Sequence, residues 1–411
     1  SLPCPTDGQI TDHYHIQAIL NEYFEDWLAI PNNLDPAAAH LAHHNTWWKG
    51  LLYYEEKHKI QLLQAQSAIP PELQDGLRRV CAVKVSVEVQ ADIQATLADT
   101  ITFEDFNASI DNLTYGGAGG PSETTVNMVR GWSKDTRRLV HRHMENIWTT
   151  RTTPKWFKDK VLKLAPKITG STELMNMRPI SLYEVLRKLW TTIVAKRIHL
   201  IWHNHRVLNG AQYGYRLDNG THMALFNVIN QIEGAVHTKT TKHATFWDIK
   251  RAFDSIPRNF QKLSWVRLGV PMEIAEWFVD LDDGGLTFIS SPFYHLKKDL
   301  KTPEEMLKRN THFTGAPEMG FEAGRGIGQG ESASSLMWTA LYDILLDFID
   351  PANRHFHEAE KNLNYTNEDI DNTNLNAYAD DLSTVASGPK GEYMQQLQAT
   401  WLSAFCAFAG L

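Results

Sequence analysis

LNAYADDLSTVA, residues 375–386, places two adjacent carboxylates between two short apolar runs. The spacing of the apolar residues predicts two short β-strands, with Ala379, Asp380 and Asp381 at the bend between them. Adjacent carboxylates repel each other, and burying them is costly unless a cation neutralises them. The segment therefore predicts a hairpin with a functional acidic turn, and the alternative for an isolated Asp-Asp pair is an ordinary polar turn.

Asp248 is a third carboxylate that interrupts an apolar strand pattern. Residues 243–249 alternate and are rich in aromatic and β-branched types, which predicts a strand that ends at Asp248. Carboxylates that converge from neighbouring strand ends suit Mg²⁺, because this ion binds a few carboxylates together with substrate phosphates. Two such ions about 4 Å apart can activate an attacking hydroxyl and stabilise the leaving oxygen in a displacement at phosphorus. We therefore expect a two-metal site for Mg²⁺, with Mn²⁺ as a possible substitute.

A long helix is predicted downstream of a proline-containing segment. Apolar residues recur at helical spacing from Leu182 to Ile198, and Ser181 with Glu184 has the pattern of a capping box. The helix is expected to bury one face and to show Arg187 outside that face.

Four further segments lead to structural expectations. A helix is expected to begin near Thr221, and another follows the glycine-rich turn at residues 326–330. Residues 285–325 lack clear periodicity and are expected to form an inserted hairpin and loop. The glycines at 116–120 permit close backbone approach, but the Gly-Lys-Ser/Thr ending of a phosphate-binding loop is absent.

The composition is that of an ordinary globular protein, with 43% apolar and 21% charged residues among 411. No stretch approaches the roughly 18 consecutive apolar residues of a membrane helix, so no membrane partner is expected. Cys4, Cys81 and Cys406 are too far apart for a zinc motif or a disulfide framework, which indicates a reducing, intracellular compartment. Because the chain begins with Ser1, it is expected to be a fragment or a processed product.

Charge is distributed unevenly along the chain. Residues 130–206 contain 17 Lys and Arg but only 5 Asp and Glu, a net charge of +12. The whole chain has a net charge of −8, so the remainder sums to −20. A local basic stretch attracts a phosphate backbone whatever the overall charge, which indicates a nucleic-acid partner. The alternative is a set of solvated helix faces.

Several segments, in the same order, resemble sequence blocks of the reverse transcriptases of non-long-terminal-repeat retrotransposons. The likeness runs from about residue 96 to the end of the chain. The matching blocks are Trp156 with Lys167, RPISL at 178–182, YGYR at 213–216, DIKRAFDSIP at 248–257, GIGQG at 326–330 and YADD at 378–381.

The resemblance implies an α+β protein with the right-hand polymerase fold, in which an antiparallel palm sheet carries the carboxylates. Residues 1–95 would be a mostly helical N-terminal extension, 96–240 the fingers and supporting palm helices, and 241–411 the catalytic palm. The family continues beyond this point with an Asn and a Lys, so the thumb is expected to be missing.

The resemblance also assigns roles at the metal and sugar positions. Asp248 and Asp380 would hold the two metal ions, and Asp381 would support them. Phe253 would lie under the sugar of the incoming nucleotide and exclude a 2′-hydroxyl, with a core aromatic as the alternative. Tyr378 and Ala379 would lie close to the primer.

The remaining roles concern the triphosphate and the template base. Lys167 and Arg178 would clamp the triphosphate, where fixed positive charge offsets the charge that develops on transfer. Generic surface charge is the alternative for both. Gln329 and Gly330 would lie beside the nucleotide and the template base.

The chain departs from the family near this last pair. Gly328 stands where an Arg commonly precedes the glutamine, and Glu331 with Ser332 replaces a frequent Cys-Pro pair. Ser335 replaces a frequent Pro. These changes put processivity or fidelity in doubt more than the chemistry.

The implied function is an RNA-directed DNA polymerase that adds deoxynucleotides to a primer 3′-hydroxyl by two-metal phosphoryl transfer. Its partners would be an RNA template, a DNA primer and deoxynucleoside triphosphates. A catalytically inactive, RNA-binding scaffold is the first alternative, although such domains usually lose a metal carboxylate and all three are present here. A metal-dependent nuclease is the second, although it would need neither the aromatic gate nor the triphosphate clamp.

Overall fold

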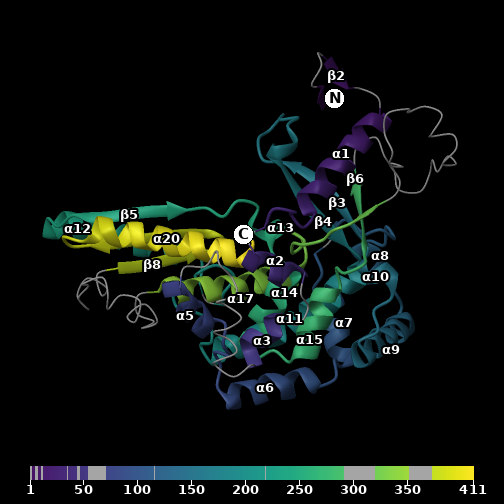
Figure 1. Ribbon diagram of the computed structural model, residues 1–411. Helices are drawn as coiled ribbons and strands as arrows, with labels where there is room; N and C mark the ends of the chain where they lie inside the picture. Colours follow the sequence, from purple (N-terminus) through teal and green to yellow (C-terminus); the bar gives the residue numbers. More distant parts are fainter. Residues whose placement is uncertain are drawn as a thin grey trace. The chain divides into compact units, whose positions relative to one another are not determined.

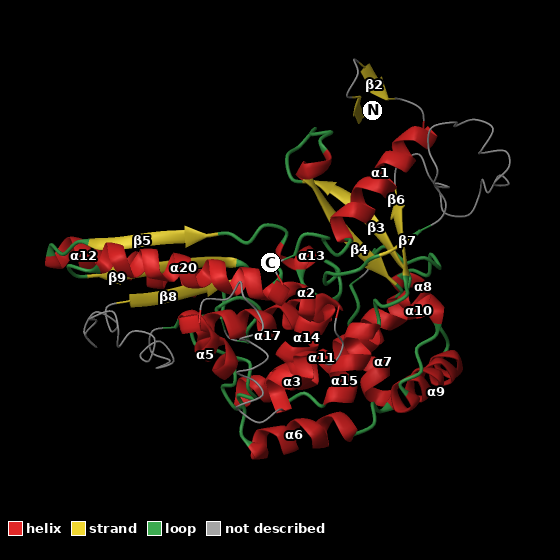
Figure 2. Ribbon diagram, viewed as in Figure 1, coloured by secondary structure: helices red, strands yellow, loops and turns green. Residues whose placement is uncertain are grey.

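The chain is a mixture of helices and strands, which confirms the α+β class (Figures 1 and 2). Among the residues that the computed structural model describes, no helix combines the length and apolar character that a membrane span requires. The described residues are 2–4, 8–10, 13–34, 36–43, 47–53, 71–114, 116–217, 219–290, 320–350 and 373–411.

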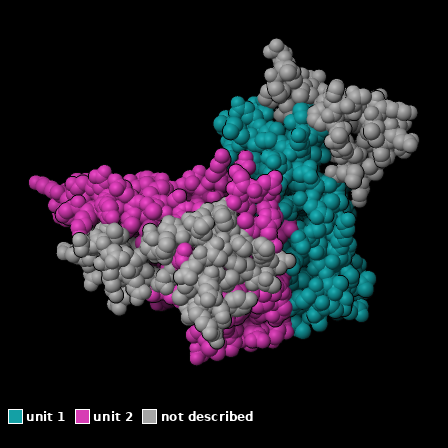
Figure 3. Space-filling model, viewed as in Figure 1, with its two compact units in different colours: residues 1–29, 100–194, 277–334 teal, residues 30–99, 195–276, 335–411 magenta. Residues whose placement is uncertain are grey.

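The chain forms two compact units, each assembled from three separated segments (Figure 3). Unit 1 contains residues 1–29, 100–194 and 277–334, and unit 2 contains residues 30–99, 195–276 and 335–411. These segments do not follow the three parts expected from the sequence, since residues 195–276 of unit 2 cross the expected boundary at 240. The functional division into extension, fingers and palm stays a prediction, as does the missing thumb.

Unit 1 contains a four-stranded mixed sheet in the order β4-β3-β6-β7. β3 is antiparallel to β4 and parallel to β6, while β6 and β7 are antiparallel. The β6–β7 pair agrees with the expected hairpin, and residues 291–319 of that segment lie outside the described residues. The strands are β3 (Lys160–Pro166), β4 (Met177–Tyr183), β6 (Leu286–Ser290) and β7 (Phe321–Glu322).

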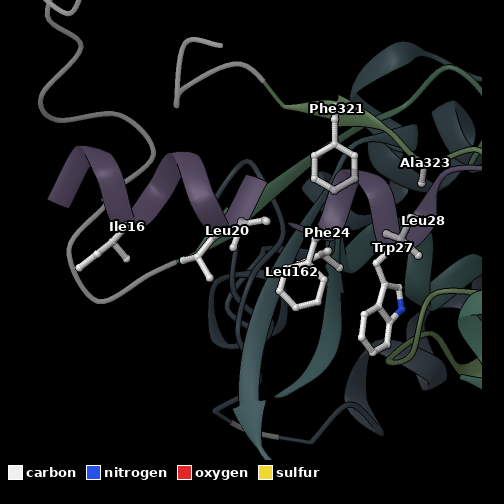
Figure 4. Packing of buried hydrophobic residues seen from close by; sticks show 9 residues of the cluster. Ile16, Leu20, Phe24, Trp27, Leu28, Leu162, Phe321 and Ala323 are labelled. Atoms are coloured by element: carbon white, nitrogen blue, oxygen red, sulfur yellow. The ribbon is translucent and has the colours of Figure 1, made fainter. Parts of the chain in front are cut away.

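Helix α1 (His13–Leu28) covers part of this sheet through an apolar stripe (Figure 4). Phe24 on the helix is fully buried and packs in one cluster with Leu162 of β3 and Ile289 of β6. The Gln17 side chain donates a hydrogen bond to the carbonyl oxygen of Ile289, at 2.9 Å. Helix α1 therefore supports the sheet that contains Arg178 in β4 and that leads to Lys167 at the end of β3.

Three helices of unit 1 begin at side-chain caps. Thr102, Thr125 and Ser133 each accept a hydrogen bond from a backbone N–H in the first turn, which satisfies donors that a helix leaves free. The three capped helices are α7 (Phe103–Asp111), α8 (Val126–Arg130) and α9 (Lys134–Thr150). Neither α10 (Lys155–Lys158) nor the 3₁₀ turn η1 (Leu174–Asn176) has a side-chain cap.

The predicted capping box at Ser181 and Glu184 is wrong. Ser181 lies in β4, where it pairs with Leu162, and helix α11 (Val185–Asn204) begins only after Glu184. The Glu184 carboxylate instead accepts hydrogen bonds from the backbone N–H and the hydroxyl of Ser122, at 2.7 and 2.6 Å. The strand ladder with β3 overrides the local capping pattern, and Glu184 ties the glycine-rich loop to the start of the helix.

Unit 2 contains a three-stranded antiparallel sheet in the order β5-β9-β8. The strands are β5 (Lys242–Trp247), β8 (Thr373–Tyr378) and β9 (Asp381–Ser387). They confirm both the strand that leads to Asp248 and the hairpin bent at Ala379 to Asp381. Helix α20 (Gly391–Ala409) packs along β5 and β9.

Two predicted helices are confirmed, with different degrees of burial. Along α17 (Ser332–Ile349) the apolar positions from Leu336 to Phe348 are at most a few per cent exposed. On α12 (Thr221–Thr238) no residue is buried, and Leu225 and Ile232 are more than half exposed. The other helices are α2 (Pro36–His43), α3 (Trp47–Tyr53), α5 (Pro71–Val80), α6 (Val87–Ala98), α13 (Ala252–Ser255), α14 (Arg258–Arg267) and α15 (Met272–Asp280).

The first ten residues contribute a small feature that the sequence patterns did not predict. β1 (Leu2–Cys4) and β2 (Gly8–Ile10) form a two-stranded antiparallel ribbon. The rest of the described chain up to residue 95 is mostly helical, as expected.

Candidate active site

The three acidic residues gather at one end of the unit 2 sheet. Tyr378 pairs with Asp381 across the β8–β9 hairpin, so Ala379 and Asp380 form its turn. Asp248 directly follows Trp247, which pairs with Leu382 on the other side of β9. The register of both ladders therefore brings Asp248, Asp380 and Asp381 to the same edge.

The carboxylates interact electrostatically. Burial raises the pKa of Asp380, and the charges of Asp381 and Asp248 raise it further, against a backbone hydrogen bond that lowers it. Burial also raises the pKa of the Tyr342 phenol, with added contributions from Asp380, Asp381 and Asp248. Within the described parts of the chain, no group of three or more His, Cys, Asp or Glu side chains is arranged so that it could hold a metal ion.

The turn of the hairpin has an unusual backbone that neighbouring side chains support. Ala379 has a φ of 57°, a left-handed conformation that costs a residue with a Cβ about 1–2 kcal/mol. Its carbonyl oxygen accepts hydrogen bonds from Trp338 Nε1 at 2.9 Å and from Gln212 Nε2 at 3.2 Å. These contacts stabilise the turn that presents Asp380.

Phe253 belongs to a column of stacked rings in the same unit. Its ring lies 5.1 Å from that of Trp338 at 21°, and Trp338 stacks on Tyr342 at 5.3 Å and 29°. The Tyr342 hydroxyl donates to the carbonyl oxygen of Asp380, at 3.2 Å. Phe253 is half-buried, so one part of its ring packs against Trp338 while another part is accessible.

The sequence patterns did not single out Trp338 and Tyr342. They lie four residues apart on α17, which places them on the same face of the helix. Each has one polar atom on a large apolar ring, and such residues usually find a hydrogen-bond partner when they are buried. Two such residues at i and i+4 on a mostly apolar helix are the sequence signal that could have identified Trp338 and Tyr342.

The segment that contains YGYR at 213–216 packs against the hairpin. The Ala377 backbone accepts a hydrogen bond from Tyr213 N and donates one to the carbonyl oxygen of Ala211, both at 2.8 Å. A Cβ on Gly214 would overlap the backbone nitrogen of Ala379, so only glycine fits there. Burial, followed by the charges of Asp380 and Tyr378, raises the pKa of Tyr215. Tyr215 thus lies within electrostatic reach of Asp380, and it was not among the predicted site residues.

In unit 1 the structure brings Lys167 and Arg178 to the same end of the β3–β4 pair. Pro166 pairs with Met177, so Lys167 and Arg178 flank this last rung of the ladder. The Lys167 backbone N–H also donates to the carbonyl oxygen of Asn176, at 2.7 Å. Both basic side chains are exposed, as an anion-binding role requires.

Gln329 and Gly330 lie beside the same strand. The carbonyl oxygen of Gln329 accepts a hydrogen bond from Ser181 N at 2.6 Å, next to a parallel bridge between Gln329 and Ile180. Gly330 has a φ of 125°, and a Cβ there would overlap the carbonyl oxygen of Ser181. The predicted residues therefore form two groups, an acidic group with Phe253 in unit 2 and a basic group with Gln329 in unit 1.

Comparison with known proteins gives two matches. A family model described as "Reverse transcriptase (RNA-dependent DNA polymerase)" matches residues 165–408, more than half of the chain and a range that contains every predicted site residue. A segment of 81 residues is 33% identical to "Probable RNA-directed DNA polymerase from transposon BS" of Drosophila melanogaster. This segment covers 20% of the present chain and 9% of that protein.

Proposed function

The chain belongs to the reverse transcriptase family, and from that membership we propose that it is an RNA-directed DNA polymerase of a retrotransposon. It extends the 3′-hydroxyl of a DNA primer with deoxynucleotides, on an RNA template. The bond between the primer 3′-oxygen and the α-phosphorus forms as the bond from that phosphorus to the pyrophosphate oxygen breaks. In this proposal the unit 2 sheet is the palm of a right-hand polymerase, and the β3–β4 pair belongs to the fingers.

One observation carries the proposal, the convergence of three carboxylates at the end of an antiparallel sheet. Repulsion from Asp381 and Asp248 adds to the cost of burying the Asp380 charge, so the group favours binding a cation. Mg²⁺ suits carboxylates in this position, because it binds a few carboxylates and takes its remaining ligands from substrate phosphates and water. The bound ions supply activation of the attacking hydroxyl and neutralisation of the leaving oxygen.

The other residues orient the substrates. Asp248 and Asp380 hold the ions and Asp381 supports them, while Tyr378 and Ala379 lie close to the primer. Phe253 excludes a 2′-hydroxyl from the sugar position by its bulk.

The basic group acts on the nucleotide. Lys167 and Arg178 bind the triphosphate, and their fixed positive charge offsets the charge that develops on transfer. Gln329 and Gly330 lie beside the position of the incoming base and limit its extent. The exposed side chains of Lys167 and Arg178 support this assignment, as does the location of Gln329 and Gly330 beside β4.

Primer extension on an RNA template with Mg²⁺ tests the proposal. Asp380→Asn keeps the shape of the side chain and removes its charge, so incorporation is expected to fall by about 10³-fold or more. Asp135→Asn on α9 is the matched control, because the Asp135 side chain is 93% exposed and forms its ion pair with Arg138, one turn away. Equal incorporation by wild type and Asp380→Asn would overturn the mechanism. RNA binding without any incorporation by the wild type would favour the inactive scaffold instead.

A further inference from the structure

Arg187 is a buried cation in unit 1, although the helical pattern predicted that it would lie outside the buried face. Its side chain is 1% exposed, and two carboxylates surround it. The guanidinium binds Glu331 in a fork, from Nε at 3.1 Å and from Nη2 at 2.8 Å. Nη2 also donates to Asp282 at 3.0 Å, and Nη1 donates to the carbonyl oxygen of Leu281 at 3.0 Å. A forked pair of this kind fixes geometry as well as charge.

Glu331 immediately follows Gly330 and so fixes the end of the loop at residues 326–331. Besides the fork from Arg187, its carboxylate accepts a hydrogen bond from the Thr191 hydroxyl, at 2.9 Å. Thr191 and Arg187 lie one turn apart on α11. The helix therefore holds the residue next to Gly330 through two side chains.

Tyr183 holds the other side of the same loop. Its ring lies under the Arg187 guanidinium, 3.9 Å from the ring centroid, and is fully buried. A Cβ on Gly328 would overlap the Tyr183 hydroxyl oxygen, so the loop approaches this ring more closely than any other residue type allows. The carbonyl oxygen of Gly328 accepts a hydrogen bond from the Ser334 hydroxyl, at 2.7 Å.

These contacts give a shared structural reason for two positions at which the sequence departs from the family. Glu331 stands where a Cys is frequent, and it meets the buried Arg187. Gly328 stands where an Arg is common, and it makes room for Tyr183. Both changes lie next to Gln329 and Gly330, and Arg187 contacts both Glu331 and Tyr183.

We propose that Arg187 and Glu331 are a positioning pair that fixes Gln329 and Gly330 against β4 and thereby sets the affinity for the incoming nucleotide. The proposal rests on the proposed function, because it assumes that Gln329 and Gly330 bind a nucleotide. The pair does not touch the substrate and acts only through the loop. Loosening it raises KM for the deoxynucleotide and increases misincorporation, while kcat at saturating nucleotide changes little.

Glu331→Gln and Thr191→Val test the pair by single-nucleotide incorporation. Glu331→Gln keeps the shape of the side chain and removes the charge-assisted fork, so KM is expected to rise about tenfold with kcat within about threefold. Thr191→Val keeps a similar volume but removes the hydroxyl, which Glu331 shares with the carbonyl oxygens of Arg187 and Lys188, and a rise of about two- to threefold is expected. Thr191→Val also keeps the test decisive if Glu331→Gln does not fold.

Arg137→Lys is the matched control in the same unit. Arg137 on α9 is 9% exposed and donates to Asn107, Asp111 and the carbonyl oxygen of Arg130, away from the loop. It is expected to lower the melting temperature without changing KM. The proposal would be overturned if Glu331→Gln raised KM no more than a control variant that loses as much melting temperature. So would a fall in kcat alone.

Hydrogen exchange of the backbone amides separates this proposal from the proposed function. Glu331→Gln is expected to speed exchange at residues 326–331 at least tenfold, whereas Arg137→Lys leaves it unchanged. If the wild type incorporates no nucleotide, the proposed function fails, and the exchange result alone decides whether the pair fixes the loop. Unchanged exchange in Glu331→Gln would overturn the pair's role in either case.

Discussion

The indole nitrogen of Trp338 lies 2.9 Å from the carbonyl oxygen of Ala379. A side chain from a buried helix thus holds the left-handed residue beside Asp380, and Phe253 stacks on the same indole ring. The acidic turn and Phe253, the proposed gate for the sugar, therefore share one support.

Trp338→Phe is expected to lower incorporation about tenfold, because it removes a hydrogen bond that supports the strained Ala379. The control is Trp190→Phe in unit 1. Trp190 is also fully buried, but its indole N–H has no hydrogen-bond partner among the described residues. Primer extension and thermal melting of both variants give the comparison. Similar losses of activity in the two would show that Trp338 acts only through packing.

Phe253→Val is expected to relax the discrimination against ribonucleotides by about tenfold or more, since a smaller side chain leaves room for a 2′-hydroxyl. The measurement is the ratio of kcat/KM for a deoxynucleotide to that for the matching ribonucleotide. Phe260→Val, at a fully buried position on α14, is the control for a general loss of packing. An unchanged ratio in Phe253→Val would leave Phe253 as a core aromatic only.

Gly214→Ala is expected to reduce incorporation by about 10²-fold, because a Cβ there would push against the backbone of Ala379 and displace the turn. Gly210→Ala lies four residues earlier in the same loop, where a Cβ would meet no atom within 4 Å. This control is expected to retain near-normal activity. Equal activity of the two variants would show that the hairpin tolerates the displacement.

Asp380→Asn is expected to stabilise the metal-free protein while it abolishes activity. The pKa of Asp380 is raised by burial and by Asp381 and Asp248. The folded protein therefore binds this proton more tightly than the unfolded chain does. The ionised group disfavours folding above its folded pKa, and the penalty disappears as the pH falls through that value.

At pH 7.5 without divalent ions, Asp380→Asn should melt at a higher temperature than the wild type. Added Mg²⁺ should raise the melting temperature of the wild type more than that of the variant. Destabilisation by Asp380→Asn, or equal Mg²⁺ effects in both proteins, would contradict the expected repulsion among the carboxylates.

Asp347 should make the protein lose stability in acid. It is buried on α17, where Arg267 and Lys84 form ion pairs with it. Burial alone would raise its pKa, but these two cations outweigh burial and lower the pKa from 3.8 to about 2.

A carboxyl with a lowered pKa contributes stability above its unfolded pKa and loses it as the pH falls through the folded value. The free energy of unfolding should therefore decrease by about 2 kcal/mol between pH 4 and pH 2 through this group. Asp347→Asn should show a shallower decrease in urea titrations over that range. The same slope in both proteins would assign the acid lability to other groups.

Local patterns predicted the parts of the fold that depend on neighbouring residues. Alternation located β5 and the β8–β9 hairpin, and helical spacing located α17 and its buried face. The sequence blocks that resemble the family gave the candidate site residues. In the structure these residues lie in two groups. Their catalytic roles stay predictions until they are tested.

The features that the sequence patterns missed depend on partners far along the chain. Ser181 has a capping pattern, but it is recruited by Leu162 into a strand ladder. Arg187 follows the polar spacing of a helix, yet its partner Glu331 lies 144 residues away. Neither pairing leaves a periodic signal, so propensity and spacing alone favoured the wrong environment for both residues.

The alternation of the chain between its two units has a practical consequence. Unit 1 draws on residues 1–29, 100–194 and 277–334, so no single uninterrupted stretch encodes either unit. Truncating this 411-residue stretch from either side would delete part of a folded unit well before it removed a separable module. Deletion mapping would then report collapse of the protein rather than the location of an activity. Substitutions that leave the backbone intact are the sound way to dissect this molecule.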